Sequence, residues 1–261
     1  MDQALIEKVM KEVTAEMQSE NKSACAPVTT GCGLTEFVGT SMGNTYGLVI
    51  ASIDPMLIEH FNLGKYRSIG IIGSRTGAGP QLMAVDEAVK ATNTEVISVE
   101  LPRDTEGSGG HGCLIIVGAD DVSDAKRAVE IALDVTPKYF GDVYGTSDST
   151  NFLEFQYTAR ASSCLNKAFG TPIGKAFGFT NGCPGAIGVV LADIAVKAAN
   201  VEVVSISTPK NGGTSFSNEC ICAITGDSGA VRQAIRAAID AGKQLLGATG
   251  GTITSSTTPY I

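Results

Sequence analysis

One thirteen-residue stretch occurs twice in the chain, and this repetition constrains the fold more than any other feature. DEAVKATNTEVIS at 86–98 returns as DIAVKAANVEVVS at 193–205, with nine identical positions and no insertion or deletion. Self-similarity at a fixed period is the sequence signature of a duplicated structural unit. Each copy runs from an alanine-rich segment typical of a helix, through an asparagine, into β-branched residues typical of a strand. The repeated unit therefore contains a helix that leads into a strand.

The similarity extends beyond this core. In the same alignment Pro102 corresponds to Pro209 and Cys113 to Cys220. We therefore predict a tandem duplication of a unit of about 110 residues. The expected divisions are an N-terminal amphipathic helix and linker over 1–33, a first domain over 34–145, a second domain over 150–247 and a C-terminal tail over 248–261.

Hydrophobic periodicity and turn residues place strands and helices in the same order in both units. In the first unit we expect strands at 34–41, 45–54, 68–73, 95–101 and 113–117, and helices at 55–62, 81–92 and 123–135. In the second unit we expect strands at 153–158, 176–179 and 220–225, and a further strand that ends at 207. We expect helices at 162–169 and two more, one that ends at 200 and one that ends at 247. Gly247 is the expected left-handed residue after the last helix, and the tail beyond it is expected to be mobile. This order favours an α+β sandwich, in which helices pack on one face of each sheet.

Composition excludes several classes of protein. The net charge is -8 and basic residues are scattered, so there is no electrostatic footprint for nucleic acid. No apolar stretch approaches the roughly 20 residues that a membrane helix needs, and no secretory signal begins the chain. Seven cysteines without the spacing of a disulfide framework indicate reduced thiols and a cytosolic location.

Two long loops carry the most unusual chemistry. PRDTEGSGGHG at 102–112 and PKNGGTSFSN at 209–218 each leave a strand at a proline and enter the next strand through small polar residues. Loops of this length inside a compact domain are often functional. The residues available to bind or filter a polar small molecule are Arg103, Asp104, Gly109, Gly110, His111, Thr214, Ser215, Phe216 and Asn218. An ordinary mobile surface loop is the alternative interpretation.

Nothing in the sequence indicates a catalytic site. The chain has two histidines and no nucleophile with a base at a recognised spacing. Asp86 with Lys90, and Asp193 with Lys197, are acid–lysine pairs four residues apart; such a solvated pair contributes roughly 0.3 kcal/mol. Cys183 lies in a glycine-rich segment and could ligate a metal only together with cysteines of other subunits, so we expect no metal and no cofactor.

Several motifs together resemble one known family. GAIGVVLADIAVKAANVEVVS, followed by CICAITGDSGAVRQAIRAAIDAG, resembles the shell-protein domain of bacterial microcompartments, the BMC domain. Two extra strands precede the family's usual first strand in each unit, which resembles the circularly permuted form of the domain. TEFVGT, RTGAGP, PRDTEGSGGHG, FGDVYG, LEFQYTARAS and GTSFSNE make the chain most similar to the tandem, permuted B-type shell proteins of propanediol- and ethanol-utilisation compartments.

This resemblance implies a fold and a structural function without catalysis. It implies two tandem, circularly permuted, ferredoxin-like α/β sandwich domains, and a homotrimer that imitates a hexagonal tile in the compartment shell. In the family a lysine and an asparagine lie at the tile edge and contact neighbouring shell proteins; here these residues are Lys90, Asn93, Lys197 and Asn200. The two long loops take the position of the family's pore loops, and the channel is expected either on the threefold axis or between the domains of one chain.

The remaining expectations concern partners and alternatives. The pore would pass small polar metabolites such as diols or alcohols, and the N-terminal helix would tether enclosed enzymes. One alternative function is an electron-conducting tile with an iron–sulfur cluster held by Cys183 of three chains. Another is a trimeric ligand-binding regulatory protein.

Overall fold

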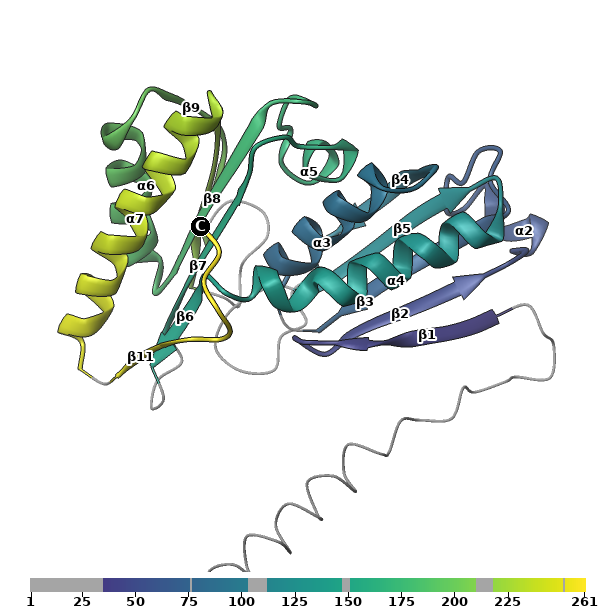
Figure 1. Cartoon of the computed structure of the whole chain (residues 1–261), viewed down its shortest axis with the longest axis horizontal. Coiled ribbons are helices and arrows are strands. Elements are labelled where there is room, and N and C mark those ends of the chain that lie inside the picture. The colour runs from purple at the N-terminus through teal and green to yellow at the C-terminus, as the bar shows by residue number, and fades with distance from the viewer. Residues whose placement is uncertain (1–34, 76, 103–111, 147–150, 210–217, 251) are drawn as a thin grey trace, which may run out of the picture.

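A computed structural model describes residues 35–261 except 76, 103–111, 147–150, 210–217 and 251. The two repeated units lie side by side, and each consists of an antiparallel sheet with its longest helices on one face (Figure 1). The N-terminal helix and all but Asn218 of the predicted pore residues therefore fall outside the described residues.

The first unit contains a five-stranded sheet in the order β1-β2-β3-β5-β4. Its elements are β1 (Thr35–Ser41), β2 (Thr45–Ile50), α2 (Pro55–Ile58), β3 (Ser68–Ser74), α3 (Gly79–Lys90), β4 (Thr94–Glu100), β5 (Cys113–Ala119) and α4 (Val122–Tyr139). The expected turn between β1 and β2 is confirmed, since Gly43 and Asn44 both have positive φ, at 70° and 49°. Asp54 caps α2, accepting a hydrogen bond from the Met56 backbone N–H at 2.9 Å.

Glycines in the first sheet allow a close approach of α4. A Cβ atom on Gly47 would lie 2.5 Å from Val129, and one on Gly70 would lie 2.7 Å from the same side chain. On the opposite face, Ile53 and Leu63 of the segment around α2 pack against Ile69. The long helices therefore cover one face of the sheet, as expected, and the α2 segment covers the other.

The second unit contains a six-stranded sheet in the order β11-β6-β7-β8-β10-β9. Its elements are β6 (Val143–Thr146), β7 (Phe152–Thr158), α5 (Ser163–Phe169), β8 (Ala176–Cys183), α6 (Gly185–Ala198), β9 (Val201–Ser207), β10 (Cys220–Gly226), α7 (Ser228–Ala248) and β11 (Ile253–Ser255). Gly178 repeats the role of Gly70, because a Cβ atom there would lie 2.7 Å from Val231 of α7. The alternation of helix and strand predicted from the repeat is thus present in both units.

The structure differs from the sequence-based expectations at three places. β6 lies inside the expected first domain, yet it pairs with β7 in the second sheet. The last helix runs through Gly247 to Ala248, so Gly247 is not its left-handed end; Gly250, with φ of 92°, has that conformation. The tail expected to be mobile instead forms β11, which pairs with β6, and then runs back to the boundary between the units (Figure 1).

Candidate functional site

The boundary between the two units is a continuous apolar core. Leu82, Met83 and Val96 of the first unit belong to the same buried cluster as Cys164 and Leu165 of α5 in the second. The rings of Phe169 and Phe177 stack beside them, with centroids 5.4 Å apart. We call this boundary the junction. Because its core matches a domain interior in composition and burial, we expect the two units to move as one body.

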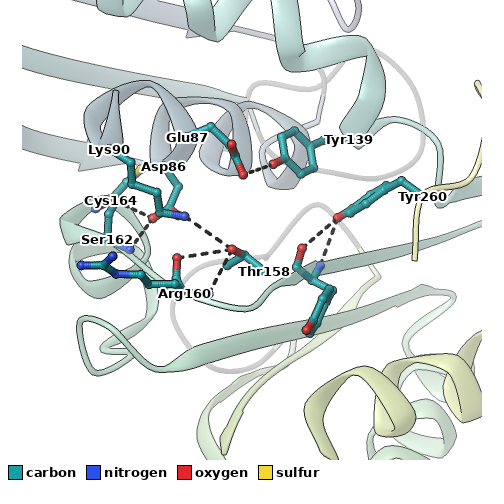
Figure 2. Close-up of polar contacts among 10 residues, drawn as sticks. Asp86, Glu87, Lys90, Tyr139, Thr158, Arg160, Ser162, Cys164 and Tyr260 are labelled. Atoms are coloured by element: carbon teal, nitrogen blue, oxygen red, sulfur yellow. Dashed lines mark hydrogen bonds and ion pairs between the residues drawn. The ribbon is translucent and has the colours of Figure 1, made fainter. Parts of the chain in front are cut away.

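A buried carboxylate crosses the junction. Asp86 of α3 is fully buried and accepts hydrogen bonds from the backbone N–H of Ser162, at 2.8 Å, and from the Ser162 hydroxyl (Figure 2). Its other oxygen lies 2.6 Å from the ammonium of Lys90, which also donates to the Thr158 hydroxyl at 3.4 Å. The charge of Asp86 is therefore paired and hydrogen-bonded to both units, as a buried charge requires.

The C-terminal tail closes the junction from a second side. The ring of Tyr260 meets the ring of Tyr139 edge-on, with centroids 5.1 Å apart, and its hydroxyl donates to Gln156 at 2.8 Å. The same hydroxyl accepts from the backbone N–H of Tyr157 (Figure 2). Asp142 accepts hydrogen bonds from the backbone N–H groups of Tyr260 and Ile261. Tail, first unit and second unit are thus tied together at one point.

A small cavity of about 30 Å³ lies at the junction, between the start of α3 and the strands β7, β8 and β10. Glu154 and Glu219, both buried, line it with Asn181, whose amide donates to Glu219. Burial raises the pKa of Glu154 to about 8; a hydrogen bond from Gln156 opposes this shift and the charge of Glu219 adds to it. Glu154 therefore carries its proton near neutral pH and can donate as well as accept a hydrogen bond.

α3 and β4 correspond in the repeat to α6 and β9. Equivalent residues are buried in the first pair of elements and exposed in the second. Residues that the repeat aligns differ in exposure: Leu82 (1%) and Val189 (54%), Met83 (1%) and Val190 (40%), and Val96 (0%) and Val203 (52%). The aspartates differ likewise, since 54% of the Asp193 side chain is exposed. We call this surface of α6 and β9 the open face.

The partner of α3 at the junction also has an exposed repeat. α5 corresponds to α2 in the alignment that superimposes the strand pairing Thr158↔Phe177 on Ile50↔Ile69. Cys164 and Leu165 are fully buried, whereas their counterparts Met56 and Leu57 are 78% and 42% exposed. Met56 and Leu57 therefore form an exposed surface, which we call the α2 face. It corresponds to the surface of α5 that covers α3 inside the chain.

The structure brings only part of the predicted site together. Of the predicted pore residues, Asn218 alone is described; its side-chain oxygen accepts from the N–H of Gly185 at the start of α6, at 3.2 Å. The pore residues outside the described part of the chain are Arg103, Asp104, Gly109, Gly110, His111, Thr214, Ser215 and Phe216.

Among the predicted edge residues, the two lysines lie in different surroundings. Lys90 is held at the junction with 27% of its side chain exposed, whereas Lys197 pairs with Asp193, at 2.7 Å, and is 72% exposed. Asn93 and Asn200 are both exposed. The junction partners Ser162, Gln156 and Tyr260 were missed by the sequence reasoning, because the first two align with unlike residues, Asp54 and Leu48, and the tail has no counterpart in the first unit.

Cys183 is buried among the described residues, and burial raises the pKa of its thiol to about 11. Within the described part of the chain, no group of three or more histidine, cysteine or acidic side chains could hold a metal ion. No helix in that part is long and apolar enough to span a membrane.

Comparison with known families gives the class of protein that this fold represents. The BMC domain matches the chain twice, over residues 68–148 and 176–257, so the chain belongs to the BMC-domain family. Both matches begin at the strand, β3 or β8, that follows two additional strands of the same sheet. This order agrees with the permuted arrangement expected from the sequence.

The particular kind of BMC protein follows from individual relatives. The bacterial microcompartment shell protein PduB of Salmonella typhimurium is 53% identical over 268 residues, which cover 98% of both chains. The structure of EtuB from Clostridium kluyveri matches with a TM-score of 0.83 and 51% identity over 86% of this chain and 98% of that one. A trimeric shell protein PduB matches with a TM-score of 0.81 and 49% identity over 86% and 99%. The chain is therefore a structural shell protein of the tandem, trimeric type, and the expectation of a protein without enzymatic function is confirmed.

Proposed function

We propose that three copies of this chain close into a tile through contacts that repeat the internal junction. The observation that supports this most directly is the change from buried to exposed between residues related by the repeat. In the closed ring, the α2 face of one copy covers the open face of the next, as α5 covers α3 within the chain. Ring closure by such head-to-tail contacts is ordinary for cyclic oligomers.

The apolar residues on the two faces agree with this contact. Met56 and Leu57 on one side, and Val189, Val190 and Val203 on the other, are the kind of exposed apolar residues that mark protein interfaces. The test is sedimentation of full-length protein carrying Leu57→Asp, which should shift the trimer toward monomer. A trimer that persists would contradict the assignment of the α2 face.

We further infer that small polar metabolites pass between the two units, at the cavity lined by Glu154, Asn181 and Glu219. The side-chain oxygen of Asn181 has no hydrogen-bond partner in the described structure, and protonated Glu154 supplies a donor. Leu101, which also lines the cavity, leads into one of the two long loops, and Glu219 follows the other. A cavity of about 30 Å³ holds about one water, so a diol would pass only after the cavity widens.

Crystals soaked in 1,2-propanediol test this passage. Density for the diol beside Asn181, absent from Asn181→Leu crystals soaked identically, would support it. Density only at the threefold axis would move the channel there and contradict our inference.

The contacts with other shell proteins remain as the sequence suggested them, at Lys90, Asn93, Lys197 and Asn200. If ring closure repeats the junction, Lys197 is held between copies as Lys90 is held within the chain, so Lys197→Asp and Lys90→Asp should disturb sheet formation in electron micrographs equally. Tethering of enclosed enzymes by the N-terminal helix is tested by deleting residues 1–33 and measuring co-purified enzyme. A clear difference between the two lysine variants, or unchanged enzyme content, would contradict these proposals.

A further inference from the structure

A pocket of about 270 Å³ opens in the second unit beside the start of β9 and the end of β10. Its lining residues are Pro172, Lys175, Asn200, Val201, Glu202, Thr225, Gly226 and Asp227. It lies outside the junction and its lining includes none of Val189, Val190 and Val203 of the open face, although Asn200 in its lining is one of the residues proposed to contact other shell proteins.

The first unit fills the corresponding place with its own tyrosine. β4 and β5 pair as Glu95↔Gly118, and the equivalent pair of β9 and β10 in the second unit is Glu202↔Thr225. In the first unit the Tyr66 ring lies directly over Gly118, where an added Cβ atom would be 2.5 Å from the ring. The Tyr66 hydroxyl donates to Glu95 at 2.9 Å.

A lysine and an aspartate complete the tyrosine's surroundings in the first unit. The ammonium of Lys65 lies 4.9 Å from the centroid of the Tyr66 ring and 3.0 Å from Asp120. The pocket of the second unit also has a cation and a carboxylate in its lining, Lys175 and Asp227. Lys175 aligns with Arg67, and Asp227, the N-cap of α7, aligns with Asp121, the N-cap of α4. A lysine ammonium over an aromatic face is attracted to the ring by a cation–π interaction.

What the second unit lacks is the tyrosine. The repeat places Gly174 at the position of Tyr66; its φ is 84°, and an added Cβ atom there would meet nothing within 4 Å. The flanking backbone is the same in both units, since Ile53 N–H donates to the Arg67 carbonyl and Ala161 N–H donates to the Lys175 carbonyl. The floor differs at one residue, because Thr225 replaces Gly118 and holds a ring further out.

The repeat also indicates that the pocket stays accessible in the trimer. The side chains of Lys65 and Asp120 are 65% and 73% exposed, although the second unit packs on the first at the junction. If contacts between copies repeat the junction, the corresponding region of the second unit is equally uncovered. To this extent the inference rests on the proposed ring closure.

We infer that this pocket binds a tyrosine side chain presented by another protein, with the phenol hydroxyl donating to Glu202 and the ring beneath Lys175. The assignment follows from the occupant of the repeat-related place in the same chain. The pocket volume of about 270 Å³, with Thr225 already among the lining residues, exceeds that of a phenol ring.

The test measures binding of 4-fluorophenol to the full-length trimer by fluorine NMR. The wild-type protein should bind it saturably at one site per chain. Glu202→Ala should weaken binding about fivefold to tenfold through loss of the hydrogen-bond acceptor, whereas the matched Glu95→Ala should leave it unchanged. Thr225→Gly should tighten binding, and Tyr66→Gly should add a second site that binds more tightly than the wild-type pocket, because Gly118 takes the position of Thr225 there.

N-acetyl-tyrosinamide should displace 4-fluorophenol, since a tyrosine residue must fit with its backbone at the rim. Failure of this displacement would overturn the assignment to a protein side chain. Equal binding by wild type and Glu202→Ala, no second site in Tyr66→Gly, or equally tight binding of fluorobenzene would each overturn the inference as well. Sedimentation of every variant shows whether it is still a trimer. A variant that is monomeric but still binds 4-fluorophenol would count against the proposed ring and not against the pocket.

Discussion

Replacing Val203 by glutamate is the sharpest test of ring closure. Val203 is 52% exposed in the chain, whereas its repeat Val96 is fully buried, so we expect contact between copies to bury the remaining half of the side chain. That burial contributes about 1 kcal/mol. A carboxylate placed there would lose this term and would be desolvated without a partner, so the total cost is about 3 kcal/mol or more for each contact.

A loss of about 3 kcal/mol weakens each contact more than 100-fold. Because all three contacts of the ring carry the substitution, Val203→Glu should sediment as a monomer at micromolar concentrations where the wild type is a trimer. Its thermal unfolding as a monomer should remain cooperative, since the substituted side chain is solvated there. Val122→Glu, at a 38% exposed valine on α4 outside both faces, is the matched control and should remain trimeric. Unchanged sedimentation of Val203→Glu would refute the argument that the junction is repeated between chains.

Three further predictions concern the junction itself. Asp86→Ala should destabilise the protein by about 3 kcal/mol in denaturant titrations, because it leaves Lys90 and Ser162 unpaired. Asp193→Ala should cost less than about 0.5 kcal/mol in the monomeric Val203→Glu background, where the open face stays solvated, and equal effects in that background would contradict the contrast between the two copies. Tyr260→Ala should cost about 3 kcal/mol and increase hydrogen exchange in the tail, and exchange that does not change would show that the tail is held elsewhere. The pKa of Glu154 is raised from 4.5 to about 8, so the folded protein binds the extra proton and the stability of the wild type should fall as pH rises between these values. Glu154→Gln should remove that slope from the pH dependence of the unfolding midpoint, and a slope that persists would place its source in another group.

The duplication allowed much of the fold to be predicted. β3, α3, β4, β5 and α4, and their repeats, lie within a few residues of the expected positions, because their apolar patterns are local and occur twice. The tail was predicted wrongly, since threonine, serine and glycine carry no periodic signal. Its order depends on Tyr260 meeting Tyr139 and Gln156, which are distant from it in sequence.

The different environments of Asp86 and Asp193 show where sequence reasoning stops. Both lie four residues before a lysine in nearly identical stretches, and both were expected to form an ordinary solvated pair. The second expectation is confirmed, whereas Asp86 is buried beneath Ser162. The local sequence specifies the helix and the ion pair, but a neighbouring unit determines whether water reaches them.

Joining the two units by one polypeptide has a consequence for how the protein can change over evolutionary time. The two units of one chain meet at a fixed effective concentration, because they are covalently linked. A substitution that weakens the internal contact is therefore tolerated to the same extent at any concentration of the protein. The contact between copies has no such protection and follows mass action. Selection on residues near Ser162 therefore acts through the stability of the folded chain. Selection on residues near Val203 acts through the fraction of chains that assemble, which depends on protein concentration. The two surfaces, which descend from one ancestral surface, can therefore diverge.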